Sequence, residues 1–155
     1  MLLGGSRMSL RLRPIGHVVT KASHEALRRG SAVSKIVVDR RLVGGLEGLQ
    51  DFSHIYVLFW LHEVPKGSRR LRVHPRGRLD IKKVGIFASR SPHRPNPIGL
   101  TLVKLLSRKG RILTVKGLDA YDGTPVLDLK PHDSRDSVPR PRVPLWCKRL
   151  ERENS

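Results

Sequence analysis

The chain has 155 residues, a length that suggests one domain able to bury a hydrophobic core without disulfide bonds. Its 31 lysines and arginines outnumber its 13 aspartates and glutamates, so the formal net charge is +18. Such an excess favours a polyanionic partner, above all the phosphate backbone of a nucleic acid, although a generally basic proteome would also raise the charge.

The N-terminal segment lacks the features of a targeting or membrane segment. No run approaches the ~20 apolar residues of a membrane span, and residues 1–7 are too short and too weakly apolar for a secretory signal. The single cysteine excludes an internal disulfide bond and a thiolate metal cluster, and it fits a reducing compartment. We therefore expect a cytoplasmic protein without membrane contact, in which residues 1–8 form a disordered extension and either Met1 or Met8 is the start.

Short apolar or alternating runs predict several strands, bounded by turns rich in glycine and proline. In chain order the predicted strands are residues 11–19 (interrupted at Pro14), 32–38, 55–61, 84–88, 98–106, 112–116 and 125–129. Among the connections, residues 20–30 predict a loop or short helix, residues 42–49 a turn or one helical turn, and residues 107–110 a hairpin-like turn. This pattern indicates a mostly-β fold, an antiparallel barrel or sandwich, and the lack of a G-x-G-x-x-G loop disfavours a Rossmann-like domain.

The C-terminal tail differs from the body. Residues 138–144 predict a polyproline-II-like stretch, and residues 145–152 predict a short helix that Trp146 and Leu150 attach to the body. We interpret the tail as a strap over an edge strand. The alternative is that it extends a nucleic-acid surface through Arg140, Arg142, Lys148 and Arg149. The expected organisation is an extension (1–8), a β domain (9–137), and a Pro-rich strap with a short helix (138–155).

Positive charge is concentrated in two segments. Asp80 is the only acid between residues 66 and 94, which contain the basic residues Lys66, Arg69, Arg70, Arg72, Arg76, Arg78, Lys82, Lys83, Arg90 and Arg94. A second group without an intervening acid is Lys104, Arg108, Lys109, Arg111 and Lys116. Phosphate groups suit both segments, whereas an aromatic content of 5% disfavours a base-stacking platform of the single-strand-binding kind.

A proline-rich loop at residues 88–100, ASRSPHRPNPIGL, lies between two predicted strands. Because proline fixes φ and lacks a backbone donor, this loop is stiff and cannot join a regular ladder. It therefore presents Arg90, Arg94 and Asn96 at set positions, which suits a binding site, although a plain strand connection with solvated arginines is the alternative.

Four segments together resemble the TsaA-like family, whose best known members are the tRNA methyltransferases called TrmO. They are the proline-rich loop and the segments 45–54 (GLEGLQDFSH), 59–62 (FWLH) and 118–131 (LDAYDGTPVLDLKP). The resemblance runs in order from about Pro14 to Lys130. It implies that the 9–137 domain is a small β-barrel that forms a homodimer, with S-adenosylmethionine held near the subunit interface.

The resemblance also implies a site and a substrate. The residues expected to bind the cofactor are His62, Glu63, Arg90, Leu100, Leu118, Asp119, Ala120, Tyr121 and Asp122. Of these, Arg90 suits the methionine carboxylate and Leu100 suits packing on the adenine. The implied target is the N6 atom of a threonylcarbamoyl-modified adenosine beside the tRNA anticodon, and Arg94, Asn96 and Lys130 suit contacts with its extra carboxylate or with phosphate.

Histidines and aspartates suggest other chemistries that we disfavour. Seven histidines invite a metal site, yet no HExxH, CxxC or His-x-His spacing is present, so no metal is expected. Asp119, Asp122 and Asp128 invite a hydrolytic carboxylate pair. However, Asp122 and Gly123 suit a turn better than catalysis. Asp119 and Asp128 stay candidates for a catalytic base, and none is assigned.

The sequence departs from the family in one loop. Residues 21–30 lack the Pro-Arg-Gln segment that contacts the cofactor in bacterial members, and the extra C-terminal domain of some members has no counterpart. Two alternatives therefore stay open: a non-catalytic, basic RNA-binding β-barrel, and a methyltransferase for a substrate other than tRNA.

Overall fold

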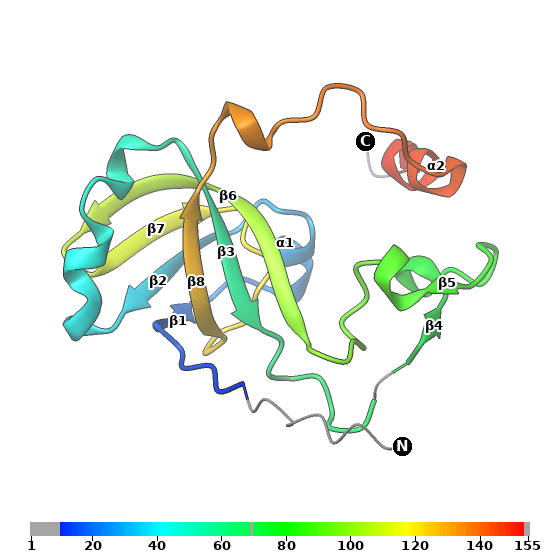
Figure 1. Cartoon of the computed structure of the whole chain (residues 1–155), viewed down its shortest axis with the longest axis horizontal. Helices are drawn as coiled ribbons and strands as arrows, with labels where there is room; N and C mark the ends of the chain where they lie inside the picture. The colour runs from blue at the N-terminus through cyan, green and yellow to red at the C-terminus, as the bar shows by residue number, and fades with distance from the viewer. Residues whose placement is uncertain (1–9, 69, 154–155) are drawn as a thin grey trace, which may run out of the picture.

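Six antiparallel strands form a closed barrel in the order β1-β2-β7-β6-β3-β8, on the left of Figure 1. The computed structural model describes residues 10–68 and 70–153, so the predicted extension over residues 1–8 lies outside the described residues. The barrel strands are β1 (Gly16–Val19), β2 (Val33–Val38), β3 (His54–Trp60), β6 (Ile98–Lys109), β7 (Ile112–Lys116) and β8 (Pro125–Pro131). The prediction of a mostly-β fold with an antiparallel barrel is confirmed.

Short helices connect the strands. They are α1 (His24–Arg28), η1 (Arg40–Leu46), η2 (Leu49–Asp51), η3 (Pro75–Gly77), η4 (Ile86–Ala88), η5 (Ser134–Asp136) and α2 (Leu145–Glu153). Ser23 begins α1 because its side chain accepts a hydrogen bond from the Ala26 N–H at 3.2 Å. The helix predicted for residues 145–152 is present as α2.

Two strand predictions need correction. The first strand begins at Gly16 rather than at residue 11, since the strand follows Pro14, which has no N–H to donate to a ladder. Residues 84–88 are a strand only over β5 (Val84–Gly85), after which the chain turns into η4. β5 pairs with β4 (Arg72–Val73) outside the barrel, so a second small sheet lies in the connection between β3 and β6.

The barrel core follows from the alternation of side chains along each strand. In β3, Ile55, Val57 and Phe59 point inward and are at most 2% exposed, while the residues between them face outward. Burial of an aliphatic or aromatic side chain of this size contributes about 1.5–3 kcal/mol. The core consists of Val18, Ile36, Val38, Leu46, Ile55, Val57, Phe59, Val103, Leu105, Leu113, Val115, Leu118, Ala120 and Val126.

Gly99 permits the close pairing of β6 with β3. It lies opposite Phe59, and a Cβ atom at this position would stand 2.3 Å from the Phe59 ring. Because Phe59 is buried and its ring has no free space, we expect Gly99→Ala to lower the free energy of unfolding by about 1–3 kcal/mol. Urea unfolding checks this, with Gly85→Ala as the control because a Cβ atom at residue 85 would have no atom within 4 Å. Equal decreases in the free energy of unfolding of the two variants would contradict the close packing of Gly99 against Phe59.

The C-terminal helix α2 lies against the side lobe, which we define as residues 72–88 (β4, η3, β5 and η4), on the right of Figure 1. Arg149 Nη2 lies 2.7 Å from Asp80 Oδ2, and Arg78 pairs with both Asp80 and Glu153. Leu150, on the same helix, is 5% exposed. The six-stranded barrel is closed and offers no edge to cover, so these contacts attach the strap to the side lobe.

These ion pairs make the attachment of α2 dependent on pH. Hydrogen bonds from Arg78 lower the pKa of Asp80 to about 2 and also lower the pKa of Glu153. A depressed carboxyl pKa stabilises the fold fully above the unfolded pKa, and this stabilisation is lost as the pH falls through the folded pKa. We therefore expect the NMR signals of the α2 amides to move toward random-coil positions as the pH falls from about 4 to about 2.

A pair of variants separates this effect from general acid unfolding. At neutral pH, Asp80→Asn is expected to reproduce the shifts of the α2 amides. Asp133→Asn removes an equivalent carboxylate, which pairs with Arg135 at 2.6 Å and also has a pKa of about 2, from a different part of the surface. It should leave the α2 signals unchanged, and identical shifts in the two variants would contradict the proposed contact.

Candidate functional site

Three of the motif segments meet at one end of the barrel, where β3 ends and β8 begins. Just beyond β3, the Leu61 N–H donates to the Pro97 carbonyl of the proline-rich loop at 2.8 Å. His62 Nδ1 lies 3.3 Å from Thr124 Oγ1 in the 118–131 segment. Segments that are far apart in the sequence thus form one continuous surface around His62, and Glu63 and Asn96 are exposed at its margin.

A tight turn shapes the segment that precedes β8. The Thr124 N–H donates to the Tyr121 carbonyl at 3.2 Å, and Gly123 adopts a φ of 74° that favours glycine. Asp122 Oδ1 accepts a hydrogen bond from the Thr20 N–H at 2.9 Å, which ties the turn to the end of β1. The prediction of a turn at Asp122 and Gly123 is therefore confirmed.

The side chains of segment 118–122 divide between the core and the surface. Leu118 and Ala120 are 0% and 4% exposed, so Leu118 presents no atoms to a ligand at the surface and Ala120 presents few. Tyr121 stacks on the His24 ring with a centroid distance of 4.2 Å. Between them, Asp119 reaches the surface, and partial burial raises the pKa of its carboxyl although Arg28 acts in the opposite direction. Burial thus favours the protonated form of the Asp119 carboxyl relative to a fully solvated aspartate.

Arg94 organises the proline-rich loop from within. Its Nη1 donates to the carbonyls of Ser89 at 2.8 Å, Ile86 at 3.3 Å and Ser91 at 3.4 Å, and its guanidinium lies 6.0 Å from the Phe87 ring centroid. Arg90, by contrast, is exposed, and no hydrogen bond or ion pair described for residues 10–68 and 70–153 occupies its side chain. The whole guanidinium of Arg90 is thus available to a ligand, whereas that of Arg94 is fixed through Nη1 and has only its other N–H groups to offer.

Two predicted site residues lie away from His62. Lys130 is near the other end of β8, on the order of 17 Å along the strand from Pro125, and its Nζ pairs with Asp128 Oδ2 at 2.9 Å. Leu100 lies on the outer wall of the barrel and is 46% exposed. The structure thus brings neither side chain to the surface around His62 within a single copy of the chain.

Leu100 belongs to an apolar outer wall that we call the β3–β6 face. Three cross-strand pairs form it: Trp60 with Ile98, Leu58 with Leu100, and Tyr56 with Leu102. Ile98 and Leu102 are 36% and 43% exposed, so a row of large apolar side chains faces solvent. An exposed apolar patch of this kind is typical of a contact surface with another macromolecule.

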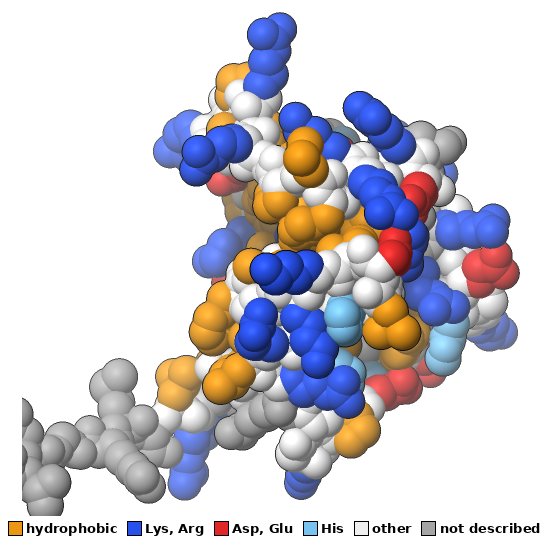
Figure 2. All heavy atoms as spheres, turned by 90° about the vertical axis from the view of Figure 1, so that its right-hand side faces the viewer, with side chains coloured by type: hydrophobic (Ala, Val, Ile, Leu, Met, Phe, Trp, Pro, Cys, Tyr) orange, Lys and Arg blue, Asp and Glu red, His pale blue; other side chains and the backbone are white. Residues whose placement is uncertain are grey.

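The side lobe carries half of the basic residues of the first basic segment, namely Arg72, Arg76, Arg78, Lys82 and Lys83. Figure 2 shows many lysine and arginine side chains on the face that includes this lobe, interspersed with hydrophobic side chains and few acidic ones. Asp80 is held by Arg78 and Arg149, so it does not neutralise the remaining cations. This surface has the charge and openness that contacts with phosphate groups require.

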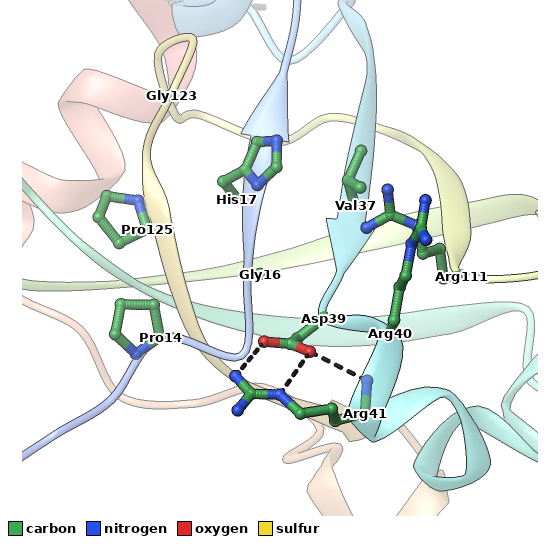
Figure 3. Close-up of a pocket in the computed structure, with 10 residues that line it drawn as sticks. All are labelled: Pro14, Gly16, His17, Val37, Asp39, Arg40, Arg41, Arg111, Gly123 and Pro125. Atoms are coloured by element: carbon green, nitrogen blue, oxygen red, sulfur yellow. Dashed lines mark hydrogen bonds and ion pairs between the residues drawn. The ribbon is translucent and has the colours of Figure 1, made fainter.

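A separate groove crosses the outer wall over β1 and β2 and measures about 700 Å³ (Figure 3). None of the predicted site residues lines it, although Gly123 and Pro125 from the end of the motif turn do. Three arginines line it, Arg40, Arg41 and Arg111. Arg111 belongs to the second basic group of the sequence, whereas Arg40 and Arg41 lie in no motif that would have indicated them. Thr124, which contacts His62, was not predicted as a site residue although it lies in the DGTP motif. His24, which stacks on Tyr121, belongs to no sequence motif that would have indicated a site.

Two features are absent from the described residues, a metal-binding cluster and a helix that could span a membrane. The ranges 10–68 and 70–153 contain no cluster of three or more His, Cys, Asp or Glu side chains placed for a metal ion. Within the same ranges, none of the helices has the length and apolar character that crossing a membrane requires.

Comparisons with known proteins agree with the motifs. The chain is 46% identical over 132 residues to a protein of Methanothermobacter thermautotrophicus named probable S-adenosyl-L-methionine-binding protein, covering 82% of this chain and 93% of that protein. It is 48% identical over 87 residues to the tRNA (adenine(37)-N6)-methyltransferase of Mus musculus, covering 56% of this chain but only 20% of the mouse protein.

A solved structure and a family match complete the comparison. The crystal structure of TrmO from Pseudomonas aeruginosa superposes with a TM-score of 0.71 and 28% identity, covering 92% of this chain and 63% of that chain. The family described as the tRNA-methyltransferase O N-terminal domain matches residues 11–136. Since this match spans most of the sequence, the chain belongs to the tRNA-methyltransferase O N-terminal domain family.

Proposed function

We propose that the chain is an S-adenosylmethionine-dependent methyltransferase that acts on tRNA in the cytoplasm. The proposed target is the N6 atom of a threonylcarbamoyl-modified adenosine beside the anticodon. The observation that carries this proposal is the meeting of three family motifs around His62, through the Leu61–Pro97 and His62–Thr124 contacts. The names of the relatives support the cofactor and, at partial coverage, the reaction.

The predicted cofactor-binding residues have side chains and backbone groups that fit the groups of the cofactor. Arg90 would hold the methionine carboxylate through paired N–H donors, and the exposed carboxylate of Glu63 would accept hydrogen bonds from ribose hydroxyls. The solvent-accessible backbone within segment 118–122, at Asp119, Tyr121 and Asp122, would supply the N–H and C=O partners that adenine requires, because the turn at Gly123 holds that backbone in place. Leu100 would pack on the adenine ring.

The cofactor supplies an electrophilic methyl group on a sulfonium, which is already a good leaving group. The protein therefore needs chiefly to align the donor and the acceptor and to exclude water. The sulphur–methyl bond breaks as the N6–methyl bond forms, and the amine loses a proton. We propose Asp119 as the acceptor of that proton, because its raised pKa favours proton uptake, whereas Asp128 pairs with Lys130 on the outer wall.

We also propose that the active species is a homodimer joined through the β3–β6 face. Pairing of this face with a second copy would cover Ile98, Leu100 and Leu102, which a monomer leaves 36–46% exposed. It would also explain why Leu100 lies away from His62 in one chain, since a cofactor at the interface could contact residues of both copies.

The net charge of +18 and the short 21–30 loop favour one alternative, an RNA-binding barrel without catalysis. A methyl-transfer assay separates the two functions. Labelled S-adenosylmethionine is mixed with threonylcarbamoyl-modified tRNA that lacks the N6-methyl group, and unmodified tRNA serves as the control. We expect label only in the modified tRNA. RNA binding without transfer would favour the alternative, and transfer only to other acceptors would exclude tRNA as the substrate.

A further inference from the structure

We propose that the groove over β1 and β2 is a phosphate-binding subsite that holds the backbone of the RNA substrate beside the methylation site. The proposal rests on the proposed RNA substrate but not on any particular cofactor. The groove is lined by Pro14, Gly16, His17, Val37, Asp39, Arg40, Arg41, Arg111, Gly123 and Pro125, which are labelled in Figure 3.

The charge in the groove is positive because its only lining carboxylate is already occupied. Asp39 Oδ1 accepts from the Arg41 backbone N–H at 2.9 Å and from Arg41 Nε at 3.2 Å, and Oδ2 accepts from Arg41 Nη2 at 2.8 Å. These bonds lower the pKa of Asp39 to about 2, so the Asp39–Arg41 pair is neutral over the physiological range. Two uncompensated guanidinium groups, those of Arg40 and Arg111, remain.

The two arginines differ in how they are held. Arg111 is half-buried, and its Nη1 donates to the Val38 carbonyl at 3.1 Å, so the guanidinium is positioned while its other N–H groups stay available. Arg40 is exposed, and its side chain has no ion-pair or hydrogen-bond partner within residues 10–68 and 70–153. A fixed and an adaptable guanidinium lining one groove suit the several oxygens of a phosphate.

The floor of the groove allows close approach. Gly16 has no side chain, and a Cβ atom there would stand 2.4 Å from the Val37 carbonyl oxygen, so the pairing of β1 with β2 requires glycine. Pro14 and Pro125 also line the groove, and neither side chain carries a charge. The exposed side chain of His17 also lines the groove, so an anion in the groove would meet the His17 ring as well as the guanidinium groups.

The position of the groove favours an RNA backbone over a free phosphate compound. Gly123 lines the groove and also belongs to the turn that follows residues 118–122. Figure 3 shows Gly123 on the opposite side of the groove from Arg40 and Arg111, so an RNA backbone that crosses the groove from these arginines would lead toward the segment proposed to hold the cofactor. The groove is a surface channel that a continuous chain can cross, and a flanking nucleotide of the target adenosine would reach it.

Binding of an anticodon stem-loop, measured by fluorescence anisotropy over a series of KCl concentrations, tests the proposal. For Arg40→Gln/Arg111→Gln we expect about tenfold weaker binding at low salt and a slope of log K against log[KCl] that is shallower by about 1. The control, Arg29→Gln/Arg152→Gln, removes the same formal charge from two other exposed side chains. It should change the affinity much less.

Two further measurements keep the test decisive. Arg40→Gln alone removes a side chain without an internal partner, so a loss of affinity in this variant cannot come from misfolding. NMR of the arginine Nε–H groups should show Arg40 and Arg111 shifting with the stem-loop at concentrations where AMP or inorganic phosphate has no effect. Equal losses in both double variants would mean that only net charge matters, and tight binding of AMP that RNA does not displace would indicate a small-molecule site. Either result would overturn the proposal.

Failure of this proposal can be distinguished from failure of the proposed function. Calorimetry with S-adenosylmethionine reports on the cofactor site, and the groove variant is expected to bind the cofactor as the unchanged protein does. If the unchanged protein binds no cofactor, the methyltransferase proposal fails while the stem-loop measurements still decide whether the groove holds RNA.

Discussion

Arg90→Ala is expected to weaken the binding of S-adenosylmethionine by roughly 10- to 100-fold, because a hydrogen-bonded contact with a charged group contributes about 1.5–3 kcal/mol. The carboxylate of the cofactor needs a cation, and the proline-rich loop holds Arg90 at the surface while Arg94 donates to two carbonyls of that loop and to the Ile86 carbonyl of η4. Isothermal titration calorimetry with both proteins gives the two affinities directly.

Arg70→Ala is the matched control for this variant. Arg70 is also exposed, and its backbone N–H bond to the His93 carbonyl at 3.2 Å does not depend on its side chain. The control should bind the cofactor within about twofold of the unchanged protein. If Arg90→Ala binds as tightly as Arg70→Ala, the carboxylate is held elsewhere and the assignment of Arg90 is wrong.

Leu100→Asp is expected to convert the proposed homodimer into monomers and to reduce cofactor binding at the same time. A carboxylate in the middle of the β3–β6 face would be buried without a partner on association, and burial of an unpaired charge costs several kcal/mol. In the monomer, Leu100 is 46% exposed, so the substitution should leave the fold intact. Analytical ultracentrifugation measures the association, and calorimetry measures the affinity for the cofactor.

Val33→Asp provides the comparison on another outer wall of the same barrel. Val33 lies at the start of β2 and is 51% exposed, so the change in polarity and exposure is similar. This variant should sediment as the unchanged protein does. A monomeric unchanged protein, or a dimer that survives Leu100→Asp, would contradict the proposed interface.

Local sequence patterns predicted the barrel well where strand and turn signals agree. The bounds predicted for residues 112–116 coincide with β7, and the run at 55–61 corresponds to β3 shifted by one residue. The turn at Asp122 and Gly123 was also predictable, because its geometry depends on Gly123 at positive φ and on the local bond from the Thr124 N–H to the Tyr121 carbonyl. Such features depend on neighbouring residues, which the sequence shows directly.

Features that depend on distant contacts were not predictable. Residues 86–88 have the composition of a strand but form η4, because β5 pairs with β4 in the side lobe and not with the barrel. The groove combines Arg40 and Arg111, which lie 71 positions apart in the sequence and come together only through the pairing of β2 with β7. The stacking of His24 on Tyr121 likewise joins two segments that share no pattern.

The central claim is that this barrel binds S-adenosylmethionine at the end where His62 contacts Thr124, in the turn that follows residues 118–122. Calorimetric titration of the purified chain with the cofactor tests it most directly. We predict saturable binding that Arg90→Ala weakens and Arg70→Ala does not. A folded protein that releases no heat and shows no binding by equilibrium dialysis would contradict the claim, and the basic surface would then point to RNA binding without methyl transfer.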